Sequence, residues 1–378
     1  MVSSRRTVLK GLVAGVVAAP VPAPRRASAA ASIVQNQSRP WITVRGIYGG
    51  YLREMGPRGE TPAGHGVNAV WVGSGSLNDA AVAEMRGLGL QVFAEFNSMH
   101  AAQYLKANPD AAPIGPDGQP SPPPQGWQGV SAFHPGYRRD RMTEFRRVLT
   151  AYEIDGIWLD YHHAHANWEQ AQPDLPDTDF SPHALRAFTE TTGIVLPREV
   201  PAAARLLLGT HREIWTTFRC DVFSDWVREY RAILTDVRPR ALLGTFHCPW
   251  SPEEYDGAIR HKLAIDLPSQ ARYLDVFSIM PYHARFGHAA DPAWIGRQVS
   301  ALGRLLKVEG RSGETPRIWP IVQLADWGDR VPVEQIATVL DHGTRPPATG
   351  VMAFNWGGLA KTWEKVEAIG QAYRRYRG

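Results

Sequence analysis

The sequence predicts a single α/β domain, a (β/α)8 or TIM barrel, over residues 32–378. Eight apolar, β-branched or aromatic runs are bounded by turn residues, and most are separated by stretches with helical periodicity. Strands that alternate with helices form a parallel sheet, and eight such strands close into a barrel. The chain contains no internal repeat and no linker that would separate two domains.

The expected strands are, in chain order, residues 42–48, 68–72, 90–96, 156–161, 241–247, 274–282, 318–324 and 350–356. The clearest expected helices are residues 80–88, 141–152, 213–234, 294–307 and 333–340. The apolar side chains of 213–234 fall near one stripe, which is typical of a helix packed against a core.

Two long loops depart from the minimal repeating unit of the barrel. Residues 109–124, after the third strand, contain seven prolines and two glycines, so they form neither a helix nor an inner strand. Residues 164–209, after the fourth strand, precede the next long helix. Both loops follow the carboxyl ends of strands, where barrel enzymes place their sites, and we expect them to shape a cleft.

The first 31 residues predict a signal peptide. Arg5-Arg6 precedes the short apolar stretch 11–21 and then Ala27-Ser28-Ala29, a pattern typical of twin-arginine export to the periplasm or outside the cell. The apolar stretch is too short for a membrane span. Without its five basic residues, the 41 Lys and Arg become 36 against 37 acidic residues, so no nucleic-acid surface is expected.

Cys220 and Cys248 are the only cysteines. In an exported protein they could form a disulfide, provided that a helix and the end of a strand bring them to the required distance. The sequence leaves this pairing open.

The fourth expected strand ends in a carboxylate, Asp160, which follows an apolar run from Ile157. Side chains alternate between the two faces of a strand, so Asp160 is expected to share a face with Trp158 and His162, opposite Tyr161. Asp160 should therefore lie at the mouth of the barrel.

Polar and aromatic residues are concentrated where the other strands end. Hydroxyl groups of a sugar need polar partners and its C–H faces stack on aromatic rings, so this mixture predicts a carbohydrate site. The predicted substrate-binding residues are Asn97, Tyr161, His162, His163, His247, Trp250, Tyr282, His283, Gln323, Asp326, Trp327, Asn355 and Trp356.

Glycoside hydrolysis requires two carboxyl groups. Asp160 is the first candidate, and Glu95 and Glu254 are the candidate partners, with Glu253 and Asp326 as competitors. Neighbouring parallel strands lie about 4.8 Å apart, so Glu95 and Asp160 could be close enough for one to raise the pKa of the other.

Structural roles compete with these functional ones. Asp160 could cap a helix or pair with an arginine, and Glu95 could form hydrogen bonds without taking part in a chemical step. Packing is the expected role of Trp71, Trp319 and Phe354, whereas Trp250, Trp327 and Trp356 are expected to be sugar platforms. The histidines at 162, 163 and 165 also allow a metal site, although strand alternation separates the last two from Asp160.

Several stretches resemble the glycosyl-hydrolase-like 10 family of bacterial proteins. They are Ala132-Phe-His-Pro-Gly-Tyr137, Tyr152-Glu-Ile-Asp-Gly-Ile-Trp-Leu-Asp-Tyr161, Trp215-Thr-Thr-Phe-Arg219, Arg238-Pro239 and Asp275-Val-Phe-Ser-Ile-Met-Pro-Tyr-His283. The resemblance covers residues 41–356 and implies a TIM barrel related to retaining glycosidases, with Asp160 as the key carboxylate. His134 and the residues after Tyr161 depart from the family pattern, so substrate contacts there are not implied.

The sequence thus predicts an exported glycoside hydrolase, with retention of configuration implied by the resemblance, acting on an oligosaccharide or polysaccharide without a cofactor. Two alternatives stay open: a carbohydrate-binding barrel without chemistry, and a metal-dependent hydrolase that uses His162, His163 and His165. The sugar, the oligomeric state and the second carboxylate are left open as well.

Overall fold

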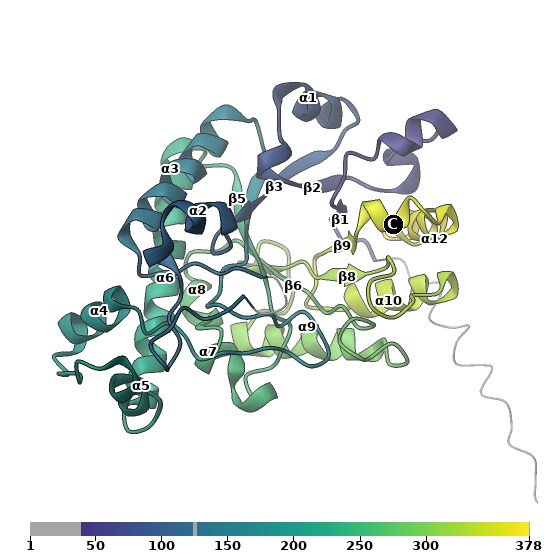
Figure 1. The fold of residues 1–378 in the computed structure, drawn as a ribbon. Coiled ribbons are helices and arrows are strands. Elements are labelled where there is room, and N and C mark those ends of the chain that lie inside the picture. Colours follow the sequence, from purple (N-terminus) through teal and green to yellow (C-terminus); the bar gives the residue numbers. More distant parts are fainter. Residues whose placement is uncertain (1–38, 124–126, 378) are drawn as a thin grey trace, which may run out of the picture. The chain divides into compact units, whose positions relative to one another are not determined.

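The protein folds as a TIM barrel in a computed structural model that describes residues 39–123 and 127–377 (Figure 1). The expected signal peptide, residues 1–31, lies outside these ranges, and its role in export stays a prediction that cell fractionation would test. The strands are β1 Val44–Tyr48, β2 Ala69–Gly73, β3 Gln91–Asn97, β4 Gly156–Asp160, β5 Leu242–His247, β6 Val276–Ile279, β7 Arg317–Ile318, β8 Ile321–Gln323 and β9 Gly350–Phe354.

All neighbouring strands are parallel, in the order β7-β6-β5-β4-β3-β2-β1-β9-β8. The seventh expected strand, 318–324, is divided into β7 and β8 by Trp319 and Pro320. Trp319 N donates to Phe277 O at 3.0 Å on the β6 side, and Met352 N donates to Pro320 O at 2.9 Å on the β9 side. The nine segments therefore correspond to the eight predicted strands, and this divided strand closes the barrel.

Helices follow the strands and cover the outside of the barrel (Figure 1). The five expected helices are observed, although the helix expected from residue 141 begins at Pro135 and the last is preceded by a 3-10 turn at Val333–Gln335. The helices are α1 Asp79–Gly87, α2 Ala102–Ala107, α3 Pro135–Ala151, α4 Pro182–Thr192, α5 Val200–Leu208, α6 Arg212–Val237, α7 Ala258–His261, α8 Leu267–Gln270, α9 Ala293–Leu306, α10 Ile336–Gly343, α11 Trp356–Leu359 and α12 Trp363–Arg375.

Aromatic side chains fill the barrel below its mouth. Trp71 lies 4.5 Å from Phe93 and 5.3 Å from Trp158 between ring centroids, and Trp158 lies 5.8 Å from Trp319. All four residues have no more than 1% of their surface exposed. The packing role expected for Trp71 and Trp319 is confirmed. Because this aromatic layer fills the barrel, inward-pointing side chains nearer the carboxyl ends of the strands face the mouth.

A glycine on the neighbouring strand β5 leaves room for the indole of Trp158. A Cβ atom on Gly244 would overlap the ring of Trp158, which also donates from Nε1 to Ser278 Oγ at 3.0 Å. We expect Gly244→Ala to destabilise the protein by about 1–3 kcal/mol, because the packed indole has no free space to enter. Thermal unfolding followed by circular dichroism measures the effect. The control is Gly87→Ala at the end of α1, where the new Cβ meets no atom within 4 Å. An equal loss of stability in both variants would contradict the prediction.

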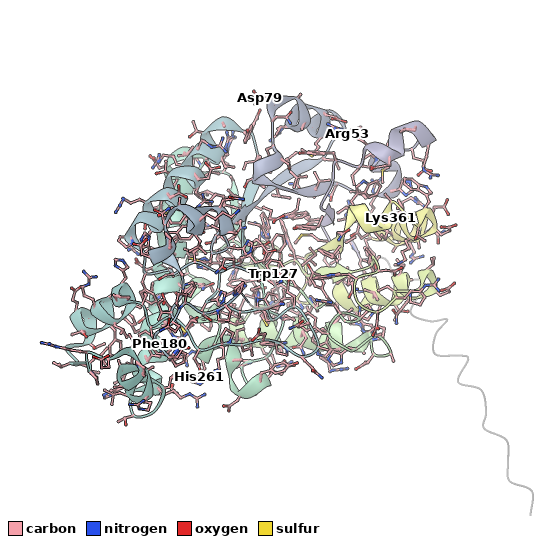
Figure 2. The ribbon with its side chains drawn as sticks, in the orientation of Figure 1. Arg53, Asp79, Trp127, Phe180, His261 and Lys361 are labelled. Atoms are coloured by element: carbon pink, nitrogen blue, oxygen red, sulfur yellow. The ribbon has the colours of Figure 1, made fainter. Side chains whose placement is uncertain are left out.

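The two predicted long loops are joined to each other beside the barrel. The buried carboxylate of Asp179 accepts hydrogen bonds from Ile114 N and Ser181 N, both at 2.9 Å, and from Ser131 Oγ. The proline-rich loop contains one 3-10 turn and one isolated bridge, as expected for a surface excursion. The loop after β4 builds a second apolar cluster against α6, which includes Phe180 (Figure 2).

Both cysteines are buried and unpaired, so the disulfide that the sequence left open is not formed in the structure. Across residues 39–123 and 127–377, no helix combines the length and apolar character needed to cross a bilayer.

Candidate functional site

A cavity of about 390 Å³ opens at the carboxyl ends of the strands. Asp160 at the end of β4 and Glu169 in the following loop both line it. The lining residues are Tyr48, Gly49, Trp127, Asp160, Tyr161, Glu169, Phe246, Met280, Tyr282, Ile321, Trp327, Phe354, Asn355 and Gly357.

Asp160 and Glu95 form a carboxyl pair, as the adjacency of their strands predicted. Strand pairing places Asn97 beside Asp160, and a hydrogen bond joins the Asp160 and Glu95 side chains. Burial, followed by the charge of Glu95, raises the pKa of Asp160 well above its ordinary range. The raised pKa favours the protonated form of Asp160, with the Glu95 side chain as its hydrogen-bond partner.

Tyr48 fixes the other side of this pair. Its hydroxyl donates to Glu95 Oε2 at 2.6 Å, and burial raises the pKa of Tyr48, so the hydroxyl keeps its proton. Asp160 Oδ1 in turn accepts from the backbone N–H of Tyr161 at 2.9 Å. Glu95, which does not itself line the cavity, thus receives two hydrogen bonds and holds Asp160 in place.

Glu169 is the carboxyl group that sequence reasoning missed. Burial raises its pKa to about 7, the charge of Glu95 adds to this, and the charge of Arg285 opposes it. Arg285 Nε also donates to the backbone O of Glu169 at 2.7 Å. In the sequence, the one sign of its role is its position directly after Trp168, in the loop that follows β4.

The chain turns sharply after Asp160, and this overturns the expected alternation of side chains. Tyr161 has a φ of 51°, in the left-handed region, which ends the extended conformation. Its ring therefore lines the cavity beside Asp160 instead of facing away. His162 is 3% exposed and lies against α6, where its Nε2 donates to Phe223 O at 2.9 Å.

Aromatic rings form two walls of the cavity. Trp127 and Tyr161 lie 4.6 Å apart between centroids on one side. On the other, Phe354 lies 4.7 Å from Tyr282 and 5.3 Å from Trp327. Tyr161, Tyr282, Trp327 and Asn355, predicted to bind substrate, all line the cavity, and their binding role stays a prediction. Phe354 was expected in the core but lines the cavity, and Trp127 was not predicted.

The three clustered histidines make separate hydrogen bonds to the protein. His162 Nδ1 accepts from Ser98 Oγ at 2.9 Å, and burial lowers the pKa of His162 to about 4. His163 Nδ1 donates to Ala164 O at 2.7 Å. His165 uses both ring nitrogens, with Gly129 N at 3.1 Å and Pro122 O at 2.9 Å. Both nitrogens of His162 and of His165 are occupied by protein partners, which disfavours the metal-site alternative.

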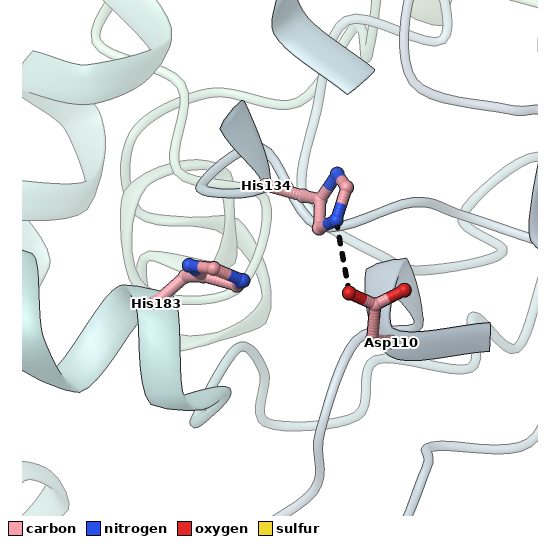
Figure 3. A group of neighbouring side chains, drawn as sticks. All are labelled: Asp110, His134 and His183. Carbon is pink, nitrogen blue, oxygen red and sulfur yellow. Dashed lines mark hydrogen bonds and ion pairs between the residues drawn. The ribbon is translucent and has the colours of Figure 1, made fainter. Parts of the chain in front are cut away.

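A different cluster brings three possible metal ligands together among the described residues: the donor atoms of Asp110, His134 and His183 lie within 4.8 Å of one another (Figure 3). His134 Nδ1 accepts from Tyr137 N at 3.0 Å and so caps α3, and its Nε2 donates to Asp110 at 3.3 Å. Metal binding through Nε2 would need the proton to move to Nδ1, against the Tyr137 N–H. His134 therefore serves as the N-cap of α3, a role that disfavours metal binding through its Nε2.

Several predicted binding residues hold loops instead of facing the cavity. Gln323 Oε1 accepts from Arg285 N at 2.9 Å and its Nε2 donates to Trp327 O at 2.8 Å. Asp326 pairs with Lys365 at 2.6 Å on the outside of the barrel. Asn97 Oδ1 accepts from His100 N at 3.0 Å.

Five further predicted residues are also placed away from the cavity, whereas His163 lies beside Asp160, Tyr161 and Glu169 in a small adjoining pocket. Glu254 accepts from Ser251 N at 2.6 Å in the loop after β5. Trp250 and Trp356, expected as platforms, are each 3% exposed. Trp250 packs on Tyr255, and Trp356 donates to Glu54. His247 donates to Cys248 O at 2.8 Å and His283 bonds to Gln335 at 3.1 Å; both are buried.

No protein-family model and no curated protein matches the sequence, so its resemblance to the glycosyl-hydrolase-like 10 family is not established. Solved structures of glycoside hydrolases share the fold. The PgaB (BpsB) glycoside hydrolase domain from Bordetella bronchiseptica aligns with a TM-score of 0.65 at 15% identity, over 87% of this chain and 98% of that domain.

Two further enzymes align over part of their length. A β-galactosidase from the psychrophilic Marinomonas ef1 has a TM-score of 0.61 at 13% identity, covering 88% of this chain and 59% of its own. The α-L-fucosidase isoenzyme 2 from Paenibacillus thiaminolyticus has a TM-score of 0.52 at 11% identity, covering 87% and 48%. This chain spans about half to three-fifths of these two proteins, and the likeness shows the TIM-barrel fold.

Proposed function

We propose that the protein hydrolyses glycosidic bonds in an oligosaccharide or polysaccharide. One observation carries this proposal: two carboxyl groups with raised pKa values, Asp160 and Glu169, face the same aromatic-walled cavity. Glycosidases require such a pair on either side of the scissile bond. The aromatic rings offer stacking surfaces for the C–H faces of sugar rings. The shared fold with the PgaB domain and the two glycosidases supports this function.

The two carboxyl groups take different roles in this proposal. Asp160 keeps its proton because it is buried beside Glu95, so it is the general acid that protonates the leaving oxygen. Glu169 ionises near pH 7, so it is the base that activates water or the nucleophile that attacks the anomeric carbon. Glu95 and Tyr48 position Asp160. The sequence had instead named Asp160 as the first carboxylate and Glu95 or Glu254 as its partner, without Glu169.

The proposal is tested by incubating the purified protein with a panel of polysaccharides and measuring new reducing ends. We expect release from at least one polysaccharide, with loss of release in the Asp160→Asn variant. Binding of a glycan without release over long incubation would instead support a carbohydrate-binding barrel. Inhibition by a chelator would support the metal-dependent alternative.

A further inference from the structure

Trp127 and Tyr161 form one aromatic wall of the cavity. His165 makes hydrogen bonds to the chain on both sides of Trp127, at Pro122 and at Gly129. Its Nδ1 accepts from the backbone N–H of Gly129 at 3.1 Å, and its Nε2 donates to the carbonyl of Pro122 at 2.9 Å. The imidazole is 4% exposed, so these contacts are shielded from water. His165 thus joins the loop after β4 to the segment that carries Trp127.

Two backbone hydrogen bonds to the segment after β3 also anchor the chain after Trp127, and the rings of His100 and Trp127 lie 5.4 Å apart between centroids. Gln128 O accepts from Ala101 N at 3.3 Å, and Val130 N donates to Met99 O at 2.9 Å. Gly129 comes so close to the imidazole that an added Cβ would lie 2.6 Å from His165 Nδ1. The hydrogen bond to Nδ1 therefore determines how near this segment approaches the loop that carries Tyr161 and Glu169.

The two contacts define the state of the imidazole. A backbone N–H can only donate and a carbonyl can only accept, so Nδ1 must carry the lone pair and Nε2 the proton. The neutral Nε2–H tautomer alone satisfies both partners. Burial lowers the pKa of His165, which agrees with a neutral ring.

We propose that His165 is a positioning residue that holds Trp127 at the wall of the cavity through the Gly129 N–H···Nδ1 hydrogen bond. The inference rests on the proposed function only in taking the cavity as the place where a sugar binds. Trp127 completes that wall by lying 4.6 Å from the ring of Tyr161. Loss of the hydrogen bond moves Trp127 and leaves the carboxyl groups of Asp160 and Glu169 in place.

Two substitutions separate the two hydrogen bonds of His165. Asn places its Oδ1 near the position of Nδ1, so His165→Asn keeps an acceptor for Gly129 N–H and loses the donor to Pro122. Gln places its amide near the position of Nε2, so His165→Gln keeps the contact with Pro122 and loses the acceptor. Both variants carry an amide in place of the imidazole, which makes them matched controls for each other.

The test uses the full-length protein labelled with 5-fluorotryptophan and needs no substrate. The fluorine resonance of Trp127 is assigned with Trp127→Phe. We expect it to shift or broaden in His165→Gln and to stay at the wild-type position in His165→Asn, while the resonances of Trp71, Trp158 and Trp319 in the barrel floor stay unchanged in both. Gly129→Ala, which pushes the same segment away from the imidazole, should displace the Trp127 resonance as well.

An unchanged Trp127 resonance in both His165→Gln and Gly129→Ala would overturn the proposal, as would equal shifts in the Asn and Gln variants. If His165→Gln fails to fold, Gly129→Ala decides the matter. On a glycan that the protein hydrolyses, His165→Gln should raise KM about fivefold, the effect of losing one aromatic contact, and leave kcat unchanged. Failure to find any hydrolysed glycan would contradict the proposed function and leave the fluorine result standing.

Discussion

Asp160→Asn is expected to lower kcat by about 10²–10⁴-fold, because the amide cannot act as an acid toward the leaving oxygen. The fold should tolerate the change. The substituted amide can accept from Tyr161 N with its oxygen and donate to Glu95 with its nitrogen, as the protonated Asp160 does. The midpoint of thermal unfolding should therefore stay near that of the wild type. Reducing-end release and circular dichroism measure the two quantities.

The leaving group provides a sharper test of Asp160 as the acid. A glycoside of dinitrophenol needs no protonation when its bond breaks, so its hydrolysis should lose much less rate in Asp160→Asn than hydrolysis of the natural polymer. Equal losses on both substrates would contradict the acid role. Glu254→Gln is the matched control: its side chain accepts from Ser251 N away from the cavity, so turnover should be retained.

Glu169→Gln is expected to lower kcat by a similar factor and to change its dependence on pH. In the wild type, kcat/KM should rise through about pH 7 as Glu169 ionises, since the proposed base or nucleophile is active without its proton. The residual activity of the variant should lack this rise. Stopped assays of reducing ends from pH 5 to 9 measure both profiles. A wild-type rate that falls above pH 7, with this fall absent from the Glu169→Gln variant, would show that Glu169 is the acid and that the two roles are exchanged.

Glu169→Gln should also change the free energy of unfolding, and the raised pKa of Glu169 sets the direction of the change. Folded Glu169 has a pKa of about 7, above the ordinary value of 4.5, so the folded state binds its proton more tightly than the unfolded state. That stabilisation is present below about pH 4.5 and is lost as the pH rises through 7. Glu169→Gln should therefore unfold like the wild type near pH 4.5 and be more stable at pH 8, by at most about 3 kcal/mol.

Urea unfolding at the two pH values measures this difference. Glu190→Gln, in α4 and away from the cavity, is the control and should show no comparable pH-dependent gain. An equal effect of pH on the wild type and the Glu169 variant would show that Glu169 titrates normally in the folded protein.

The strands were predictable because each is a short apolar run that can be recognised from consecutive residues alone. Once β3 and β4 are neighbours, the parallel register brings Glu95 and Asp160 together, so this half of the candidate site followed from the sequence. The rule failed one residue later, where the left-handed conformation of Tyr161 exchanged the directions of Tyr161 and His162.

Aromatic and polar residues in the loops could not be sorted by type alone. Trp250 and Trp327 both follow strands beside turn residues, yet Trp250 is packed on Tyr255 and Trp327 lines the cavity. Gln323 was expected to bind substrate, but Arg285 N and Trp327 O take its hydrogen bonds. In each case the partner lies outside the strand that carries the residue, where periodicity gives no information.

The sequence by itself determined the barrel, the strand that delivers Asp160 and the neighbouring strand that delivers Glu95, since these depend on periodicity and on the regular geometry of a parallel sheet. Only the tertiary structure decided that Glu169 and Trp127 complete the cavity. Both lie in long loops whose paths are set by contacts with other parts of the chain, such as Arg285 at Glu169 and His165 beside Trp127. Loop residues of this kind have no period from which their direction can be read.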